Sequence, residues 1–271
     1  MNRVYISQLM PEKELRDVLA MSGAGPELID FSISDNLDVF DETMARTLSL
    51  LDRLGHPGVS VHGPFLDLNP MSFDSRIVRV TADRFKQAYE AALMLGADRV
   101  VYHSGMIPTV YYTEGWAERT ASFWNRFLED VRAGSAAGPL VCMENVLDRE
   151  VTPFLEAAKS VDHSGFGICL DIGHVFCYAA DPLPVWVRKL SGRIRHVHLH
   201  DNDGMCDLHL ALGEGQVPWE AAVKEMLAGP GGTEITFTIE NTSAEAAGKS
   251  LAALKTIICN ADKPEEWSVE S

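Results

Sequence analysis

Side chains that can bind a metal ion recur along the chain, and most of them directly follow a short apolar run. The motifs VHGP, YHSG, MENV, LDIGH, HVHLHD and IENT supply His62, His103, Glu144, Asp171, His198 and Glu240. Three further candidates stand in or close behind two of these motifs, and they are His174, Asp207 and His209. Mixed carboxylate and imidazole ligands suit Mn²⁺, Mg²⁺, Co²⁺ and Zn²⁺. The residue types therefore indicate a divalent-metal site, provided that the fold brings them together.

Three of these residues, Glu144, Asp171 and Glu240, are carboxylates. Crowding like charges into a partly dry site is costly, so some of them must be protonated or a cation must lie among them. A divalent ion that also binds an imidazole, such as that of His198, removes the repulsion most simply. We therefore predict a metal centre at these carboxylates.

Each of these residues also has a structural explanation when it is taken alone. A histidine at a strand end more often makes a structural hydrogen bond than binds a metal, and a Glu-Asn pair commonly marks a turn. His196, His198 and His200 are spaced by two and point to the same side of one strand, so the spacing does not choose the ligand among them. The GEG sequence at 213–215 is interpreted as a tight turn. The joint occurrence of so many candidates is what favours a site.

The chain alternates short β-rich runs with longer helical patterns, which predicts βα units and a parallel sheet. Eight strands of this kind close most naturally into a (β/α)₈ TIM barrel, and a doubly wound open sheet is the alternative. The carboxyl ends of barrel strands meet at one mouth, which would gather the metal-capable residues there. We find no linker or low-complexity tract and expect a single domain over residues 1–271. The predicted strands are 3–7, 28–33, 59–63, 99–104, 139–145, 167–172, 194–200 and 235–241.

Helical patterns fall between these strands. Residues 75–95 carry apolar side chains at spacings of three and four and end at Gly96, and residues 41–54 also end at a glycine. Pro218 opens a predicted helix over 218–228, where its missing N–H costs no hydrogen bond.

The longest irregular stretch is 106–118, with the sequence MIPTVYYTEGWAE. Its three aromatic residues, Tyr111, Tyr112 and Trp116, either cover a ligand at the barrel mouth or pack onto neighbouring helices. The sequence favours neither alternative.

The formal net charge of −16 argues against a nucleic-acid partner, because binding a polyanion depends on lysine and arginine. The chain contains no basic run. A compact, neutral or weakly anionic metabolite is the expected partner, and the sequence is also compatible with a homo-oligomer. A chain of 271 residues suits one barrel, which typically needs about 250.

The sequence predicts a cytoplasmic protein, since its first residues read as a strand rather than a signal peptide and no stretch is long and apolar enough to cross a membrane. The five cysteines form no CxxC pair and show no disulfide spacing. We expect them to be buried, reduced thiols without a thiolate zinc site.

The motifs resemble, as a set, those of the xylose isomerase-like TIM barrel superfamily, which includes sugar phosphate isomerases and epimerases, hydroxypyruvate isomerase and endonuclease IV. The resemblance runs from His62 to Glu240 and rests on HGP, ENV, LDIGH, HVHLHDNDG, DLHLALGEG and ENT. It implies a shared metal centre, for which it chooses His198 over its neighbours. The implied ligands are Glu144, Asp171, His198 and Glu240.

Similarity to endonuclease IV implies two outer metal positions in addition, whereas in the isomerase-like members the extra residues bind substrate hydroxyls. His62 and His103 correspond to one position. The other position corresponds to His174, Asp207 and His209. The chain departs from the DNA-repair enzyme in having HSG after the fourth strand and no basic recognition loops.

The predicted function is metal-dependent isomerisation or epimerisation of a small sugar, or sugar phosphate, or of a hydroxy-ketone. The ion, expected to be Mn²⁺ or Zn²⁺ with Mg²⁺ or Co²⁺ as alternatives, would polarise a carbonyl and stabilise an enediolate. Glu144 and Glu240 would be the catalytic residues that remove and return a proton. The lack of a Gly-rich phosphate loop favours an unphosphorylated sugar.

Two other functions remain open on the sequence. One is endonuclease IV-like, metal-dependent hydrolysis of abasic DNA. The other is a lyase that uses the same enolate chemistry, or a binding protein without catalysis.

Overall fold

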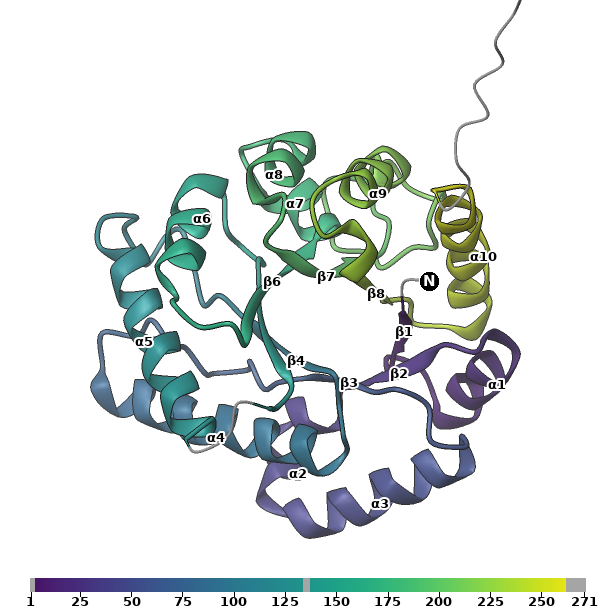
Figure 1. Cartoon of the computed structure of the whole chain (residues 1–271), viewed down its shortest axis with the longest axis horizontal. Coiled ribbons are helices and arrows are strands. Elements are labelled where there is room, and N and C mark those ends of the chain that lie inside the picture. The colour runs from purple at the N-terminus through teal and green to yellow at the C-terminus, as the bar shows by residue number, and fades with distance from the viewer. Residues whose placement is uncertain (1–2, 134–136, 262–271) are drawn as a thin grey trace, which may run out of the picture.

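Eight parallel strands close into a barrel in the order β1 to β8, and β1 pairs with β8 (Figure 1). The computed structural model describes residues 3–133 and 137–261, so the predicted domain limits at 1 and 271 lie outside the described residues. The predicted (β/α)₈ barrel is thus confirmed, and the open sheet is excluded. The strands are β1 Val4–Ser7, β2 Gly25–Leu28, β3 Ser60–His62, β4 Arg99–His103, β5 Leu140–Glu144, β6 Phe166–Asp171, β7 Ile194–Leu199 and β8 Thr236–Ile239.

Helices surround the barrel on its outside (Figure 1). The predicted helices over 41–54, 75–95 and 218–228 each agree with the structure to within one residue at either end. The α-helices are α1 Glu12–Ser22, α2 Ser34–Asp38, α3 Phe40–Arg53, α4 Ser75–Met94, α5 Trp116–Val131, α6 Val151–Ser160, α7 Ile172–Tyr178, α8 Leu183–Leu190, α9 Trp219–Ala228 and α10 Ala244–Ala261. Two 3₁₀ turns, η1 Asp30–Ser32 and η2 Gly232–Glu234, complete the description.

The second strand lies earlier in the chain than its apolar run predicted. Residues 28–33 were expected to form it, but β2 ends at Leu28 and η1 follows. Gly25 explains the position, because a Cβ there would lie 1.9 Å from the carbonyl oxygen of Gly58, and only glycine permits this approach. Because β2 covers residues 25–28, Glu27 lies inside the barrel.

The main apolar core lies between the strands and the helices. Tyr102 on β4 stacks on Phe85 of α4 at 4.3 Å between ring centroids, and Trp124 and Phe127 of α5 pack around the pair. The Tyr102 hydroxyl donates to the backbone oxygen of Phe85 at 2.7 Å. This packing fixes β4 against its helices and leaves the barrel interior free for polar side chains.

Part of the barrel interior is a polar network whose side chains come from β2, β3, β7 and β8. Glu27 Oε2 accepts hydrogen bonds from Ser60 Oγ at 2.7 Å and Thr238 Oγ1 at 2.9 Å, and it lies 3.2 Å from His196 Nε2. All four residues are fully buried. A barrel whose centre is a hydrogen-bonded network can support charged groups directly above it.

The stretch 106–118 does not place its three aromatic residues over one surface. Trp116 begins α5 and is fully buried, whereas Tyr112 is 78% exposed. Tyr111 packs against Phe73 at 5.5 Å between ring centroids. Trp116 therefore serves the core and cannot cover a ligand.

The five cysteines are all free, but not all are buried as expected. Cys142 and Cys169 are buried in the barrel, while Cys206 and Cys259 are exposed because they lie on a loop and on α10. No helix among the described residues is long and apolar enough to span a membrane.

We predict that Gly25→Ala destabilises the protein, because the added Cβ meets backbone that cannot move without disturbing the pairing of β2 with β3. The free energy of unfolding, measured by urea denaturation, should fall by more than about 2 kcal/mol. Gly248→Ala in α10 is the control: a Cβ there meets no atom within 4 Å, and its stability should stay equal or rise by up to about 1 kcal/mol. Equal stability of the two variants would contradict the prediction.

Candidate metal centre

The carboxyl ends of the strands gather the metal-capable residues at one mouth of the barrel. His62, His103, Glu144 and Asp171 are the last residues of β3, β4, β5 and β6, and Glu240 directly follows β8. The others come from β7, from α7 and from the segment between β7 and α9, and they are His198, His174, Asp207 and His209. Every residue predicted for the site therefore lies at this mouth.

His198 lies at the middle of the gathered carboxylates. Its Nδ1 atom is 3.3 Å from Glu144 Oε1, 3.3 Å from Glu240 Oε1 and 3.9 Å from Asp171 Oδ2. Donor atoms that bind one ion at about 2.0–2.2 Å lie about 3.3 Å apart in a tetrahedral arrangement. Three carboxylate oxygens thus lie within 3.9 Å of one imidazole nitrogen, which is compatible with their being ligands of one ion.

Two further clusters flank this centre. On one side, His62 Nε2 and His103 Nε2 lie 3.4 Å and 3.6 Å from Glu144 Oε2. These three residues form one of the groups whose ligand atoms lie within 4.8 Å of one another. Glu144 can therefore bridge this side cluster and the centre with its two carboxylate oxygens.

The second flanking cluster surrounds Asp207. Its Oδ2 atom lies 3.3 Å from both His174 Nε2 and His209 Nε2. The sequence expectation that His174, Asp207 and His209 come together is met in space. This cluster has the residue types to bind either a metal ion or a substrate hydroxyl.

Three of the histidines share one orientation. The Nδ1 atoms of His62, His174 and His209 donate to backbone oxygens of Gly63, Asn145 and Glu240 at 2.9, 3.1 and 2.7 Å. Their Nε2 atoms consequently face carboxylate oxygens, which can only accept. Either a proton on Nε2 or a metal ion must lie between the nitrogen and the oxygen, and fixing Nδ1 on a carbonyl is how proteins orient metal-binding histidines. The orientation fits a metal ion.

Burial and neighbouring charges shift the pKa values of Glu144 and Glu240 in opposite directions. Burial would raise the pKa of Glu144, but the imidazoles of His198, His103 and His174 hold it well below its usual range. Burial raises the pKa of Glu240, opposed by His198 and supported by the nearby carboxylates. The two carboxylates therefore differ in their tendency to hold a proton.

Glu27 lies behind His198 and was missed by sequence reasoning. Its Oε1 atom is 3.2 Å from His198 Nε2, whereas the three other carboxylates approach His198 Nδ1. A carboxylate behind a metal-binding histidine fixes the ring and strengthens its donor atom. The only signal in the sequence was a charged residue beside Gly25 and Pro26, outside the predicted strand.

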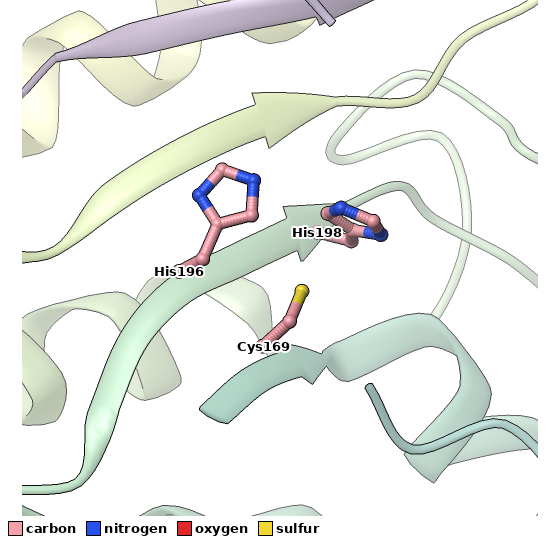
Figure 2. Close-up of side chains that lie close together, drawn as sticks. All are labelled: Cys169, His196 and His198. Carbon is pink, nitrogen blue, oxygen red and sulfur yellow. The ribbon is translucent and has the colours of Figure 1, made fainter. Parts of the chain in front are cut away.

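The three alternating histidines in and just after β7 have different surroundings. Figure 2 shows His196 and His198 projecting from β7 into the barrel, with Cys169 of β6 directed toward them. His196 is bonded at both nitrogens, to Thr236 Oγ1 at 2.7 Å and Thr238 Oγ1 at 2.9 Å, so it belongs to the interior network. Burial raises the pKa of the Cys169 thiol well above its usual value, which keeps it neutral.

Asp201 is a second residue that the sequence did not single out, and it shapes the segment that carries Asp207 and His209. Its carboxylate accepts from the backbone N–H groups of Gly213 at 2.8 Å and Val217 at 2.9 Å. The tight turn expected around Gly213 is present, with φ of 90° at this residue. These hydrogen bonds fix the conformation of the segment between β7 and α9.

The model of the family described as "Xylose isomerase-like TIM barrel" matches residues 19–257. Protein MJ1311 of Methanocaldococcus jannaschii, which is uncharacterized, is 32% identical over 206 residues, covering 73% of this chain and 69% of that protein. A probable endonuclease 4 of Mycobacterium leprae is 28% identical over 178 residues, covering 61% and 68%.

Two solved structures show the same fold over nearly the whole chain. A D-tagatose 3-epimerase-like protein has a TM-score of 0.77 and 27% identity, with coverage of 96% of this chain and 98% of its own. The TTHB071 protein of Thermus thermophilus, soaked with ZnCl₂, has a TM-score of 0.70 and 24% identity, with coverage of 96% and 99%.

We predict that Glu27→Gln weakens metal binding about 10- to 100-fold, because the ring of His198 loses the negative charge behind it. Titration of metal-stripped protein with Mn²⁺ against a competing chelator measures the affinity. Glu220→Gln, on the exposed face of α9, is the control and should bind like the unchanged protein. Unaltered affinity in Glu27→Gln would remove Glu27 from the support of the site.

Proposed function

The chain belongs to the xylose isomerase-like TIM barrel family, and from this premise we propose that it is a metal-dependent isomerase or epimerase of a small sugar or hydroxy-ketone. One observation carries the proposal. Glu144 at the end of β5 and Glu240 just after β8 each bring a carboxylate oxygen to 3.3 Å from His198 Nδ1. Two carboxylates beside one ion position are what proton removal and return at a single carbon require.

We assign the ion to Glu144, Asp171, His198 and Glu240. A divalent ion bound there would polarise the substrate carbonyl and stabilise the negative charge that develops on its oxygen. The carboxylate-rich donor set suits Mn²⁺ or Mg²⁺, and its single imidazole also admits Zn²⁺ or Co²⁺.

The chain's own carboxylates would move the proton. Glu144, whose pKa is held low by the surrounding imidazoles, stays ionised and is free to accept a proton. Glu240, whose pKa is raised by burial, holds a proton more readily and can deliver it. Environments that separate the pKa values of two carboxylates commonly divide the roles of base and acid between them.

The charge of the mouth supports a small uncharged substrate. Arg149 is the only lysine or arginine in the segments that connect the carboxyl end of each strand to the next helix, all of which the structure describes. Duplex DNA and phosphorylated sugars both depend on cationic contacts for affinity. A neutral sugar or hydroxy-ketone needs none beyond the ion.

Hydrolysis of abasic DNA is the second candidate, and one observation favours it. The nine residue types that the resemblance to endonuclease IV implies do gather into three adjacent clusters. Three divalent ions there would give the mouth the positive charge that the loops lack. An abasic duplex retained and cleaved at physiological salt would establish this function and overturn the isomerase proposal.

We predict that Glu240→Gln lowers the rate of solvent-proton exchange about 100- to 10,000-fold, because the proton carrier is lost. The measurement is deuterium uptake next to the carbonyl, followed by NMR across a panel of keto-sugars with Mn²⁺. Glu214→Gln is the control, because that side chain pairs with Lys249 on the surface. A Glu240→Gln variant with near-normal exchange on the true substrate would refute the two-carboxylate mechanism.

Asp171→Ala should weaken binding of the central ion strongly, because it removes one of four proposed ligands. Metal titration of the stripped variant measures the loss. Circular dichroism verifies that the barrel is intact, and affinity equal to that of the unchanged protein would exclude Asp171 from the ligands.

A further inference from the structure

A pocket of about 430 Å³ lies at the amino-terminal ends of β6 and β7, away from the metal centre. It is lined by the end of α6, the start of β6 and the residues that join α8 to β7. Asp171 and His198 lie toward the other end of the same two strands. Because β6 is six residues long, its two ends are about 16 Å apart. The pocket is therefore separate from the mouth, and its size is that of a small-molecule site.

The polar side chains of this pocket can all donate hydrogen bonds. They are His163, Ser191, Arg193 and Arg195, and no carboxylate is among them. Four other pockets of the described chain each contain at least one aspartate. In a chain with a formal net charge of −16, a concave surface of this composition concentrates positive potential at one place. Such a pocket favours an anion.

The guanidinium groups of Arg193 and Arg195 have no carboxylate partner among the described residues, and their hydrogen bonds go to backbone oxygens. Arg193 Nη1 donates to Ala158 O at 3.5 Å. Arg195 Nη1 donates to the backbone oxygens of Gly192 and Ile194 at 3.1 and 3.3 Å. A guanidinium group has five N–H donors, so each arginine keeps several for a ligand. Its positive charge is likewise left for a ligand to neutralise.

His163 adds a donor whose position on the ring is fixed. Its Nδ1 atom accepts a hydrogen bond from the backbone N–H of Gly165 at 2.9 Å. A ring nitrogen that accepts carries no proton, so the proton of this imidazole lies on Nε2. The pocket thus gains an N–H donor in addition to the two arginines.

Two glycines at the start of β6 leave space for arginine side chains. A Cβ on Gly167 would lie 2.6 Å from Cγ of Arg195, and a Cβ on Gly165 would lie 2.2 Å from Cζ of Arg132. The Arg132 guanidinium therefore covers Gly165, next to the pocket, where its Nη2 atom donates to Pro139 O at 2.6 Å. It brings a third positive charge to this end of the barrel.

We propose that this pocket binds the phosphate group of a small metabolite and forms a second, non-catalytic site. Guanidinium groups match phosphate oxygens with parallel N–H···O bonds, and the imidazole N–H and the serine hydroxyl supply further donors. The apolar side chains of Val161, Phe166 and Ile168 line the rest of the pocket and leave space for the uncharged part of the metabolite. No carboxylate lines the pocket to act as a base, so the ligand is held rather than converted. The site depends neither on the central ion nor on the proposed reaction.

Calorimetric titration of the full chain with inorganic phosphate and with glycerol 3-phosphate tests the proposal. At constant ionic strength, both should bind with a dissociation constant of about 1 mM or tighter. Glycerol, which lacks the phosphate, should not bind. Acetate should bind at least about 10-fold more weakly than phosphate, because it offers two oxygens and a single charge. Absence of binding by both phosphates, or acetate binding as tight as that of phosphate, would overturn the proposal.

Arg193→Gln and Arg195→Gln should each weaken the binding of glycerol 3-phosphate about 10- to 100-fold, because each removes charged donors. Arg126→Gln is the control. That side chain is exposed on α5, where its Nε atom donates to Ser122 O at 3.1 Å, and the variant should bind like the unchanged protein. Circular dichroism verifies the fold, and because Arg193 is exposed, its variant tests the proposal even if the Arg195 variant does not fold. Unchanged affinity in Arg193→Gln contradicts the assignment.

A metal ion at the mouth also attracts phosphate, so the titration is repeated on protein stripped with chelator. Binding at the proposed site should persist, and the amide NMR signals of Gly165, Gly167 and Gly192 should shift most. Loss of binding together with the metal, or shifts confined to the mouth, would place the phosphate at the metal centre and rule out the second site. Neither outcome affects proton exchange, so the isomerase proposal is tested separately.

Discussion

The carboxylates at the mouth of the barrel impose the constraint on which the rest of the site depends. Parallel strands carry Glu144, Asp171 and Glu240 to one rim, and none of them is more than 6% exposed. Burial disfavours ionised carboxylates, so the group is tolerable only where positive or donating partners surround it. The histidines meet this requirement in a particular way, because several bind backbone oxygens with Nδ1 and turn Nε2 toward the acids. That arrangement leaves positions for cations between acceptors.

The polar interior below the mouth follows from the same constraint. A histidine that binds an ion needs support on its far side, and Glu27 lies there at 3.2 Å from His198 Nε2. Glu27 is itself a buried charge, and it is held by Ser60, Thr238 and His196. Burial lowers the pKa of His196 to about 4, so this ring stays neutral and adds no competing charge. A hydrogen-bonded network thus replaces part of the apolar packing inside the barrel and supports the residues above it.

The sequence predicted the barrel and the gathering of metal-capable residues at the strand ends because both follow from local patterns. Apolar runs alternate with helical periodicity, and the polar residue that ends each run must point to the mouth. Glu27 escaped prediction because Gly25 and Pro26 are poor strand formers, so the apolar run after them attracted the strand instead. The choice among the histidines of β7 was also out of reach. The spacing of two puts His196, His198 and His200 on the same side of the strand. Their different surroundings depend on how the barrel closes and, for His200, on the space left by Gly173, and neither can be read from the sequence.

The same ligands can serve a nuclease or an isomerase, so the loops rather than the strand ends must decide between them. The loops at this mouth carry Arg149 as their only lysine or arginine, and a polyanion would approach against the charge of the protein. The segment between β7 and α9 adds no positive charge to the mouth, and Asp201 fixes its conformation by accepting hydrogen bonds from the backbone N–H groups of Gly213 and Val217. A neutral substrate needs no cationic loop, so the charge of this mouth favours a small uncharged ligand over a polyanion.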